Sequence, residues 1–290
     1  MDELEQSLNQ FLQHLADERQ YSENTIAAYR NDLKQLLRFL CKAEPAHPGA
    51  WAEVTAFMVE TYVSFLHQRD YAHSTVARKI AAVKSFFSYL YHTRTIKANP
   101  AAQLDSPKVQ KNLPKALSAD DIARLLSAPT HATGPKAIRD RAILELLYAT
   151  GMRVTELVSL AVDDLDLEHG TVTCHSAAGQ RRKMPIGDGA METLADYVRS
   201  GRALLVKDAG ERALFVNHRG QKLTRQGLWL IIKGYAQEAS LEVEVTPYIL
   251  RHSFAAHLLH SGADLHEVQE RLGHANISTT QVYTQVADEP

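Results

Sequence analysis

The sequence predicts a mainly α-helical chain of two domains, with one small antiparallel β-sheet in the second domain. Its 290 residues exceed the length of most single domains. Apolar residues recur at helical spacing through most of the chain, and an alternating pattern is confined to residues 164–187. Apolar residues make up 45% and charged residues 23%, which is ordinary for a folded protein and excludes the disordered and fibrous classes.

Residues 1–100 predict an all-helical first domain. Its four helical runs are LNQFLQHL, TIAAYRNDLKQLLRFL, VTAFMVETYVSFL and TVARKIAAVKSFFSYLY. Ser22 and Ser74 stand just before two of these runs, where a serine caps a helix well. The segment EPAHPG at 44–49 separates the second run from the third.

The segment 99–116, NPAAQLDSPKVQKNLPKA, has three prolines and no periodicity, so we expect an extended linker, placed at residues 101–116. The second domain, 117–290, begins with a helix that Ser118 caps, Asp121 standing three residues on as in a capping box. A second helix is expected over 136–149. The runs TVTC and RKMPI predict a short antiparallel sheet, after which helices resume from 188, interrupted by a strand at 213–216.

Several classes of site are absent from the sequence. There is no glycine-lysine nucleotide loop, no GxGxxG after a strand and no histidine pair at metal spacing, so we expect neither a cofactor nor a metal. Cys41 and Cys174 are too few for a disulfide framework. No apolar run reaches the roughly 20 residues of a membrane span, and the acidic, polar N-terminus is unlike a signal peptide. We therefore expect a cytoplasmic chain with no membrane partner.

The formal net charge is −2, but the charge is uneven. Residues 68–115 hold nine Lys or Arg against two acids, a local excess of +7. A solvated helix face followed by a charged linker would explain this excess, and so would a surface for nucleic acid. The candidate DNA-binding residues are Arg78, Lys79, Lys84, Lys108 and Lys111.

Four residues in the second domain have chemistry left to explain. They are Arg153 in LYATGMRVTELVSL, Arg251 in TPYILRHSFAAHLL, and His274 and Tyr283 in LGHANISTTQVYT. These segments, in this order and with a step of nine positions from His274 to Tyr283, resemble the motifs of the tyrosine recombinases, or phage integrase family, closest to the bacterial XerC and XerD proteins. The resemblance spans nearly the whole chain.

The resemblance implies a DNA clamp made of an N-terminal helical bundle and a catalytic domain. Tyr283 would join the 3′ phosphate of a cut strand, and the freed 5′ hydroxyl would attack another phosphotyrosine. Four chains would act on two sites of duplex DNA, as a homotetramer or with a related recombinase. Chromosome-dimer resolution and mobile-element integration both remain open.

These residue types suit that chemistry. Guanidinium groups give paired hydrogen bonds to phosphate oxygens, so Arg153 and Arg251 would hold the phosphate. A tyrosine has an ordinary pKa of about 10 and needs a positive field or a base to attack, which the arginines and His274 would supply. Each residue also has a simpler explanation: Arg153 pairs with Glu156, Arg251 meets another anion, His274 forms a turn, and Tyr283 packs in a core. His252 we interpret as structural.

Three departures from the family pattern favour other functions. The hairpin turn that carries the family's catalytic lysine has Ser176, Ala177 and Ala178 here, and Lys183 is the nearest lysine. Tyr248 replaces the usual histidine three residues before Arg251, and seven residues follow Tyr283, so we expect no extra C-terminal helix. A catalytically impaired DNA-binding relative is therefore the main alternative, and a relaxing topoisomerase is the third.

Overall fold

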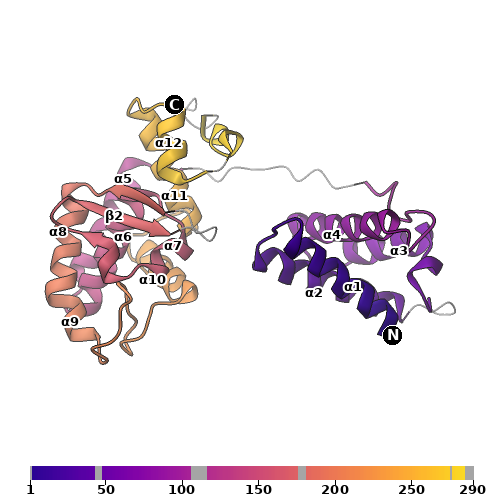
Figure 1. The fold of residues 1–290 in the computed structure, drawn as a ribbon. Coiled ribbons are helices and arrows are strands. Elements are labelled where there is room, and N and C mark those ends of the chain that lie inside the picture. The colour runs from indigo at the N-terminus through magenta and orange to yellow at the C-terminus, as the bar shows by residue number, and fades with distance from the viewer. Residues whose placement is uncertain (1, 43–47, 106–115, 176–180, 275, 285–290) are drawn as a thin grey trace. The chain divides into compact units, whose positions relative to one another are not determined.

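The structure is a computed structural model that describes residues 2–42, 48–105, 116–175, 181–274 and 276–284. The chain divides into two compact units, Met1–Asn112 and Leu113–Pro290 (Figure 1). Helices dominate both units and one small antiparallel sheet lies in the second, which confirms the predicted fold class. None of the described helices is long and apolar enough to cross a membrane.

The N-terminal unit contains the four predicted helices. They are α1 (Asp2–Asp17), α2 (Glu23–Leu40), α3 (Ala56–His67) and α4 (His73–His92), with a 3-10 turn at Trp51–Glu53. Leucines and aromatic rings fill the space between them. The Trp51 ring meets the edge of Phe86 at 4.7 Å, and its indole nitrogen donates to the Leu4 carbonyl over 3.0 Å. This hydrogen bond lets the large indole ring be buried without leaving its N–H group unsatisfied.

The two predicted serine caps have different outcomes. Ser22 caps α2, because its hydroxyl accepts the Thr25 backbone N–H over 3.2 Å. Ser74 does not cap α4: the helix begins at His73 after Ala72, whose side chain makes no capping bond, and Ser74 lies inside the first turn. The prediction was wrong because the start of the apolar run is not the start of the helix.

The second unit begins with helices and then forms the sheet. Its helices are α5 (Ala119–Ser127), α6 (Pro135–Thr150), α7 (Val154–Ser159), α8 (Asp188–Asp196), α9 (Arg202–Leu205), α10 (Arg225–Glu238), α11 (Pro247–His260) and α12 (Leu265–Leu272). Short turns lie at Ala128–His131, Val162–Asp164, Tyr197–Gly201, Ile277–Thr279 and Gln281–Tyr283. The hydroxyl of Ser118 accepts the Asp121 N–H over 3.1 Å, which confirms the predicted cap of α5. Helix α6 packs against both α8 and α11.

The sheet has three antiparallel strands in the order β1 (Leu165–Asp166), β2 (Thr171–His175) and β3 (Arg181–Pro185). Because side chains alternate along a strand, Met184 of β3 is buried and Lys183 is exposed. The predicted strand at 213–216 is wrong. Ala213 and Val216 make isolated bridges only, to Ala161 and Lys222.

The start of the second unit is attached to α11. The Leu117 N–H donates to the Ser253 hydroxyl over 2.8 Å, and the Leu117 carbonyl accepts a hydrogen bond from His257. His257 also lies 2.8 Å from the Tyr148 hydroxyl. Most of the predicted linker, 106–115, lies outside the described residues. The first described residues beyond it are therefore fixed to the helix that carries Arg251.

Candidate active site

Arg251 is the most buried cation of the candidate site. It lies on α11, 6% of its surface is exposed, and its guanidinium donates to the carbonyls of Gly151 and Leu272, each over 2.7 Å. Those carbonyls end α6 and α12, where backbone acceptors lack partners within the helix. Burial and the nearby charge of Arg153 lower the pKa of Arg251 to about 10, so it stays charged at neutral pH. In this structure backbone carbonyls and His274 take the place of the anion expected from the sequence.

A glycine lets the chain turn from α6 towards Arg153. Gly151 has φ +59°, and a Cβ there would lie 2.3 Å from a ring carbon of Phe254. Two residues later, Arg153 precedes α7, and its backbone N–H donates to Glu156 over 2.7 Å. The Arg153 guanidinium donates to the Glu156 carboxylate and to the Gly273 carbonyl, each over 3.2 Å, while 41% of its side chain remains exposed. The expected pairing with Glu156 is thus present, and it points the guanidinium towards Gly273 and His274.

Arg182 joins this cluster, although the sequence did not identify it. From β3 it makes two hydrogen bonds to Glu156, over 2.7 and 2.9 Å. Burial alone would raise the pKa of Glu156, but the bonds from Arg182 and the Arg153 backbone outweigh it and the net shift is downward. Arg182 also presses on Gly273, where a Cβ would lie 2.5 Å from its Nη1 atom. Arg182 and Arg153 therefore both bind one buried carboxylate.

His274 lies between the arginines and the tyrosine. Its Nε2 atom is 2.9 Å from Arg251 Nη2, and its Nδ1 atom is 2.9 Å from the Thr280 hydroxyl. Burial, followed by the charges of Arg251, Arg153 and Arg182, lowers the pKa of His274 to about 4. His274 is neutral at physiological pH in the free chain.

Tyr283 is the innermost member of the site. It is 3% exposed and packs in an apolar cluster with Phe254 and Leu272. Its ring stacks on His274, with centroids 6.1 Å apart and planes 15° apart, and meets the fully buried His252 at 5.1 Å. Burial raises the pKa of Tyr283, although Arg251 opposes this by its charge and a hydrogen bond. The hydroxyl is protonated in the free chain.

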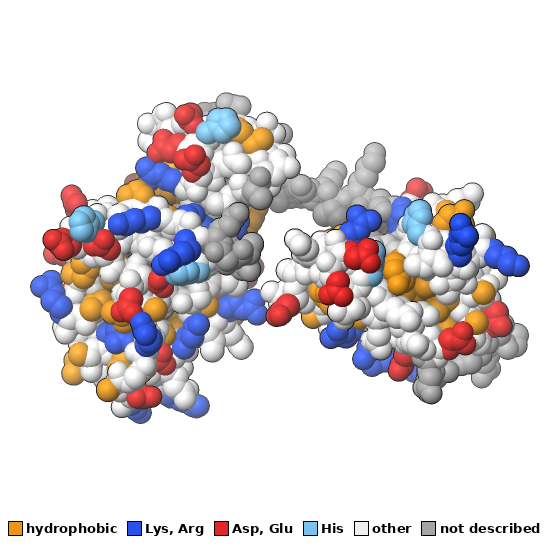
Figure 2. Space-filling model, in the orientation of Figure 1, with side chains coloured by type: hydrophobic (Ala, Val, Ile, Leu, Met, Phe, Trp, Pro, Cys, Tyr) orange, Lys and Arg blue, Asp and Glu red, His pale blue; other side chains and the backbone are white. Residues whose placement is uncertain are grey.

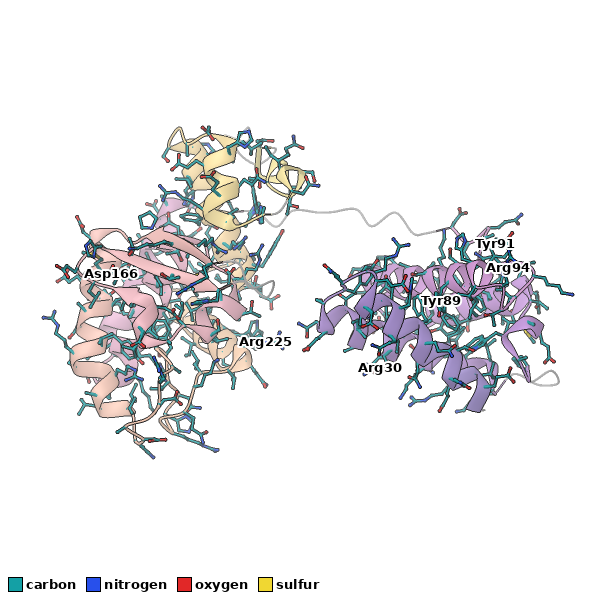
Figure 3. The ribbon with its side chains drawn as sticks, viewed as in Figure 1. Arg30, Tyr89, Tyr91, Arg94, Asp166 and Arg225 are labelled. Atoms are coloured by element: carbon teal, nitrogen blue, oxygen red, sulfur yellow. The ribbon has the colours of Figure 1, made fainter. Side chains whose placement is uncertain are left out.

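Of Tyr248 and Lys183, the two residues considered as possible accessories to the reaction, Tyr248 lies close enough to act on Tyr283 and Lys183 lies apart from this cluster. Tyr248 is 52% exposed at the start of α11 and stacks on His252 at 6.4 Å. Lys183 points to the opposite face of β3 from Arg182, and its ammonium lies 3.4 Å from the carboxylate of Asp166, on the edge strand β1 (Figure 3). Ala177 lies outside the described residues. Nowhere in the described part of the chain do three or more His, Cys, Asp or Glu side chains gather as a metal site would need.

The predicted DNA-binding cations of the first unit need correction. Lys79 is 7% exposed and binds Asp32 over 2.9 Å and Gln35 over 2.6 Å, so its charge is used inside the bundle. Arg78 pairs with the same aspartate, and Lys84 donates to the Leu104 carbonyl over 2.8 Å. Lys108 and Lys111 lie outside the described residues. The burial of Lys79 and these two contacts argue against a direct DNA contact by its ammonium, and sequence charge does not reveal that α2 buries a partner for it.

Helix α2 carries a basic row that the sequence analysis missed. Arg30, Lys34 and Arg38 are exposed at a spacing of four residues, which places them along one side of the helix; Figure 3 labels Arg30. We call these three residues the α2 row. Next to its end, a groove of about 350 Å³ is lined by Arg38, Lys42 and Arg69 together with Gln35, Phe39 and Phe65. The four-residue spacing of the three cations in the α2 row could have identified the row from the sequence.

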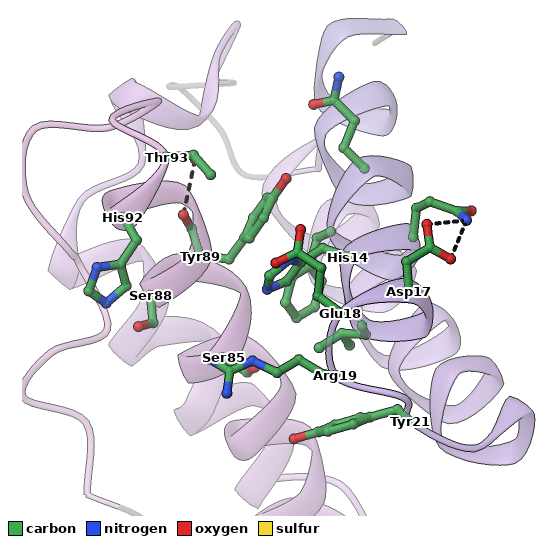
Figure 4. A pocket seen from close by; sticks show the side chains of 14 residues that line it. His14, Asp17, Glu18, Arg19, Tyr21, Ser85, Ser88, Tyr89, His92 and Thr93 are labelled. Carbon is green, nitrogen blue, oxygen red and sulfur yellow. Dashed lines mark hydrogen bonds and ion pairs between the residues drawn. The ribbon is translucent and has the colours of Figure 1, made fainter.

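A larger hollow of about 800 Å³ lies between α1 and α4 (Figure 4). His14 lines it, paired with Glu18 over 3.1 Å and lying 5.0 Å from the Tyr89 ring. Asp17 also lines the hollow, and Arg19 contributes a positive charge to the same lining. This mixed charge does not favour a phosphate backbone, and the hollow holds none of the four predicted catalytic residues. On the face seen in Figure 2, basic and acidic side chains are likewise interspersed over the second unit.

Comparisons with family models and with curated proteins both match this chain to the tyrosine recombinases. Residues 115–289 match the model described as the phage integrase family, and residues 8–94 match its N-terminal SAM-like domain. Tyrosine recombinase XerC of Herpetosiphon aurantiacus is 48% identical over 99% of this chain and 92% of its own length. Tyrosine recombinase XerD of Vibrio cholerae is 42% identical over 97% and 92%.

Solved structures show the same fold. XerA recombinase is 30% identical, with a TM-score of 0.55 over 99% of this chain and 95% of its own. XerH recombinase, in a post-cleavage complex with a palindromic difH substrate, is 23% identical, with a TM-score of 0.76 over 99% and 84%. The second likeness concerns the fold alone.

Proposed function

Because the chain belongs to the phage integrase family and is an Xer-like site-specific tyrosine recombinase, we propose that Tyr283 is the nucleophile with which it cuts and rejoins duplex DNA. The observation that carries the proposal is the convergence of Arg153, Arg251 and His274 around this tyrosine. Arg251 holds a fixed positive charge beside a hydroxyl that must lose its proton to attack.

Each residue then has a defined task. Arg153 and Arg251 bind the non-bridging oxygens of the scissile phosphate, Arg251 exchanging its contact with His274 for the phosphate. The Tyr283 oxygen attacks phosphorus, the bond from phosphorus to the 5′ oxygen breaks, and that oxygen takes up a proton from solvent water. His274 Nε2, released from Arg251, accepts the tyrosine proton, because the bound phosphate raises the pKa of this histidine. Rejoining runs these transfers in reverse, so no external energy source is needed.

The α2 row and the groove beside it are the proposed contact of the first unit with the phosphate backbone. Exposed cations on one side of a helix fit the regular charge of duplex DNA. We further propose that four chains assemble on two DNA sites, either alone or with a related recombinase, and that they act in the cytoplasm. Sizing the DNA complex of the purified chain, with and without such a recombinase, tests the assembly.

The test of function is covalent trapping. The full chain selects duplexes from a randomised library by binding, and the selected duplexes are then nicked so that the freed end diffuses away after cleavage. We expect a protein–DNA adduct with the wild-type chain. Tyr283→Phe should bind the same duplexes equally and form no adduct, and Arg153→Ala and Arg251→Ala should also lose the adduct.

Tyr148→Phe is the matched control, because Tyr148 packs against the same apolar cluster and lies outside the proposed chemistry. It should form the adduct as the wild-type chain does. A Tyr283→Phe chain that still forms the adduct would show that the nucleophile is another residue. Specific binding without an adduct in the wild-type chain would favour the binding-only relative that Ala177 suggests, and adducts on every duplex would favour a topoisomerase.

A further inference from the structure

We propose that Thr280 is a positioning residue: its hydroxyl accepts a hydrogen bond from the protonated Nδ1 of His274, which leaves Nε2 for proton exchange, and it ties this histidine to the turn that holds Tyr283. The inference deepens the proposed function and rests on it, since it concerns how His274 serves the reaction. Thr280 lies within the segment LGHANISTTQVYT, but none of the roles argued above uses its side chain.

Thr280 contacts both partners at once. Its hydroxyl lies 2.9 Å from His274 Nδ1, and its carbonyl accepts the Tyr283 backbone N–H over 2.9 Å. Its own N–H donates to the Ile277 carbonyl over 2.8 Å, and the residue is fully buried. One buried side chain and its backbone therefore connect the histidine ring to the nucleophile's turn.

The contacts of His274 determine its tautomer. A guanidinium is a donor only, so Arg251 Nη2, at 2.9 Å, requires a lone pair on His274 Nε2. The proton of the neutral ring must then be on Nδ1, from which it is donated to the Thr280 hydroxyl. The backbone at His274 is held as well, because it exchanges hydrogen bonds with Gln269 over 3.0 and 3.1 Å.

This arrangement confines proton exchange to one nitrogen. When a phosphate draws Arg251 away, Nε2 is the free position and faces the place where the phosphate binds. Nδ1 remains a donor to Thr280 whether the ring is neutral or charged, so the ring need not turn during proton transfer. The charged groups that act on His274 are Arg251, Arg153, Arg182 and Glu156, and none of them contacts Nδ1 in the described structure.

A merely structural role for Thr280 makes different predictions. If the side chain only fills space, Thr280→Val, which keeps the shape and loses the hydroxyl, should leave the imidazole unchanged. If the hydroxyl positions His274, Thr280→Ser should restore what the valine variant loses.

The experiment measures the ¹⁵N shifts of the His274 ring in the full chain, with His274→Gln assigning the signals, and the rate of adduct formation on the trapping duplex. Because Arg251 still requires a lone pair on Nε2 in every variant, we expect the Nδ1–H tautomer in all three chains. The Nδ1 shift should keep its hydrogen-bonded value in the wild-type and Thr280→Ser chains and move away from it in Thr280→Val. Adduct formation should slow about 10- to 100-fold in Thr280→Val, within the range of lost acid–base assistance, and by less than about 3-fold in Thr280→Ser.

A wild-type chain with the proton on Nε2 overturns the inference even if Thr280→Val does not fold. So does a Thr280→Val chain with a wild-type Nδ1 shift or a wild-type rate of adduct formation. Failure of the proposed function is a separate result: an adduct from Tyr283→Phe, or none from the wild-type chain, would refute the function, while the ring shifts of the free chain would still decide the role of Thr280.

Discussion

Two parallel hydrogen bonds join Arg182 on β3 to Glu156 on α7, Nη1 to Oε1 over 2.7 Å and Nη2 to Oε2 over 2.9 Å. The same carboxylate holds the backbone and the side chain of Arg153. Only 3% of the glutamate side chain and 18% of the arginine side chain are exposed. The sheet is thereby fastened to the start of α7, and the orientation of Arg153 depends on a residue from a different element.

Removing one partner of this pair should destabilise the second unit. Arg182→Met should cost about 2–4 kcal/mol, because it leaves a buried carboxylate with less compensation. The Arg182→Met, Glu156→Leu double variant should cost less than the two single changes together. Urea unfolding measures both. Arg212→Ala is the control, since its pair with Asp163 is largely exposed and should contribute less than about 1 kcal/mol. Additive single effects would contradict the coupling.

Gly151→Ala should destabilise the fold around Arg251. The new Cβ would overlap Phe254, at roughly 1–3 kcal/mol, and the positive φ would add about 1 kcal/mol. Thermal unfolding measures the loss. Gly234→Ala is the matched control: it lies within α10 with nothing within 4 Å of an added Cβ, so it should stabilise by about 0.5–1 kcal/mol. Equal melting temperatures for the two variants would show that Phe254 yields without cost.

The stability of the free chain should fall as the pH decreases between about 6.5 and about 4. These are the ordinary and the folded pKa values of His274, the latter lowered by burial and the surrounding arginines. Between them the unfolded chain binds a proton that the folded chain excludes, so acid favours unfolding; above this window the effect vanishes. Urea unfolding of the wild-type and His274→Asn chains at several pH values measures it. The variant should show a shallower loss, and parallel curves would contradict the shifted pKa.

DNA binding should weaken steeply with salt, and the α2 row should account for part of the slope. Each cation that neutralises a phosphate adds about 0.9 to the slope of log K against log salt. Arg38→Gln should lower the slope by about that amount, and so should Lys34→Gln. Arg19→Gln, an exposed arginine beside the acidic hollow, should leave the slope unchanged. An unchanged slope in all three would exclude the α2 row from the interface.

Cleavage of ordinary DNA should be slow, because Ala177 replaces the lysine that protonates the leaving 5′ oxygen in the family. General-acid assistance is worth roughly 10²- to 10⁴-fold. A duplex with sulfur at the 5′ bridging position needs no such proton and should be cut much faster, while Ala177→Lys should reduce that difference. Lys183→Ala should change neither rate, since Lys183 pairs with Asp166 on the exposed face. Equal rates on oxygen and sulfur duplexes would mean that a general acid is already present.

The sequence predicted the helices of the first unit and the hairpin strands well, because one periodic pattern determines each of them. It brought Arg153, Arg251, His274 and Tyr283 together only through a family resemblance. No spacing rule relates residues 130 positions apart. Arg182 was missed because the sequence of β3 does not show which of its two sides faces the rest of the domain. That depends on which elements cover the sheet. The buried ion pair of Lys79 was missed for a similar reason: Asp32 is 47 residues away in the chain, yet 2.9 Å away in space.

The burial of Tyr283 bears on how well the proposed covalent link between the protein and a cut DNA strand would resist hydrolysis. At 3% exposure, between two imidazole rings and an apolar cluster, the tyrosine oxygen has little access to water. With Tyr283 as the proposed nucleophile, a DNA strand joined to that oxygen would be shielded from hydrolysis for as long as this packing holds. The cut strand would then keep the capacity to be resealed, and a stalled reaction would leave a protected covalent junction instead of a permanent strand break.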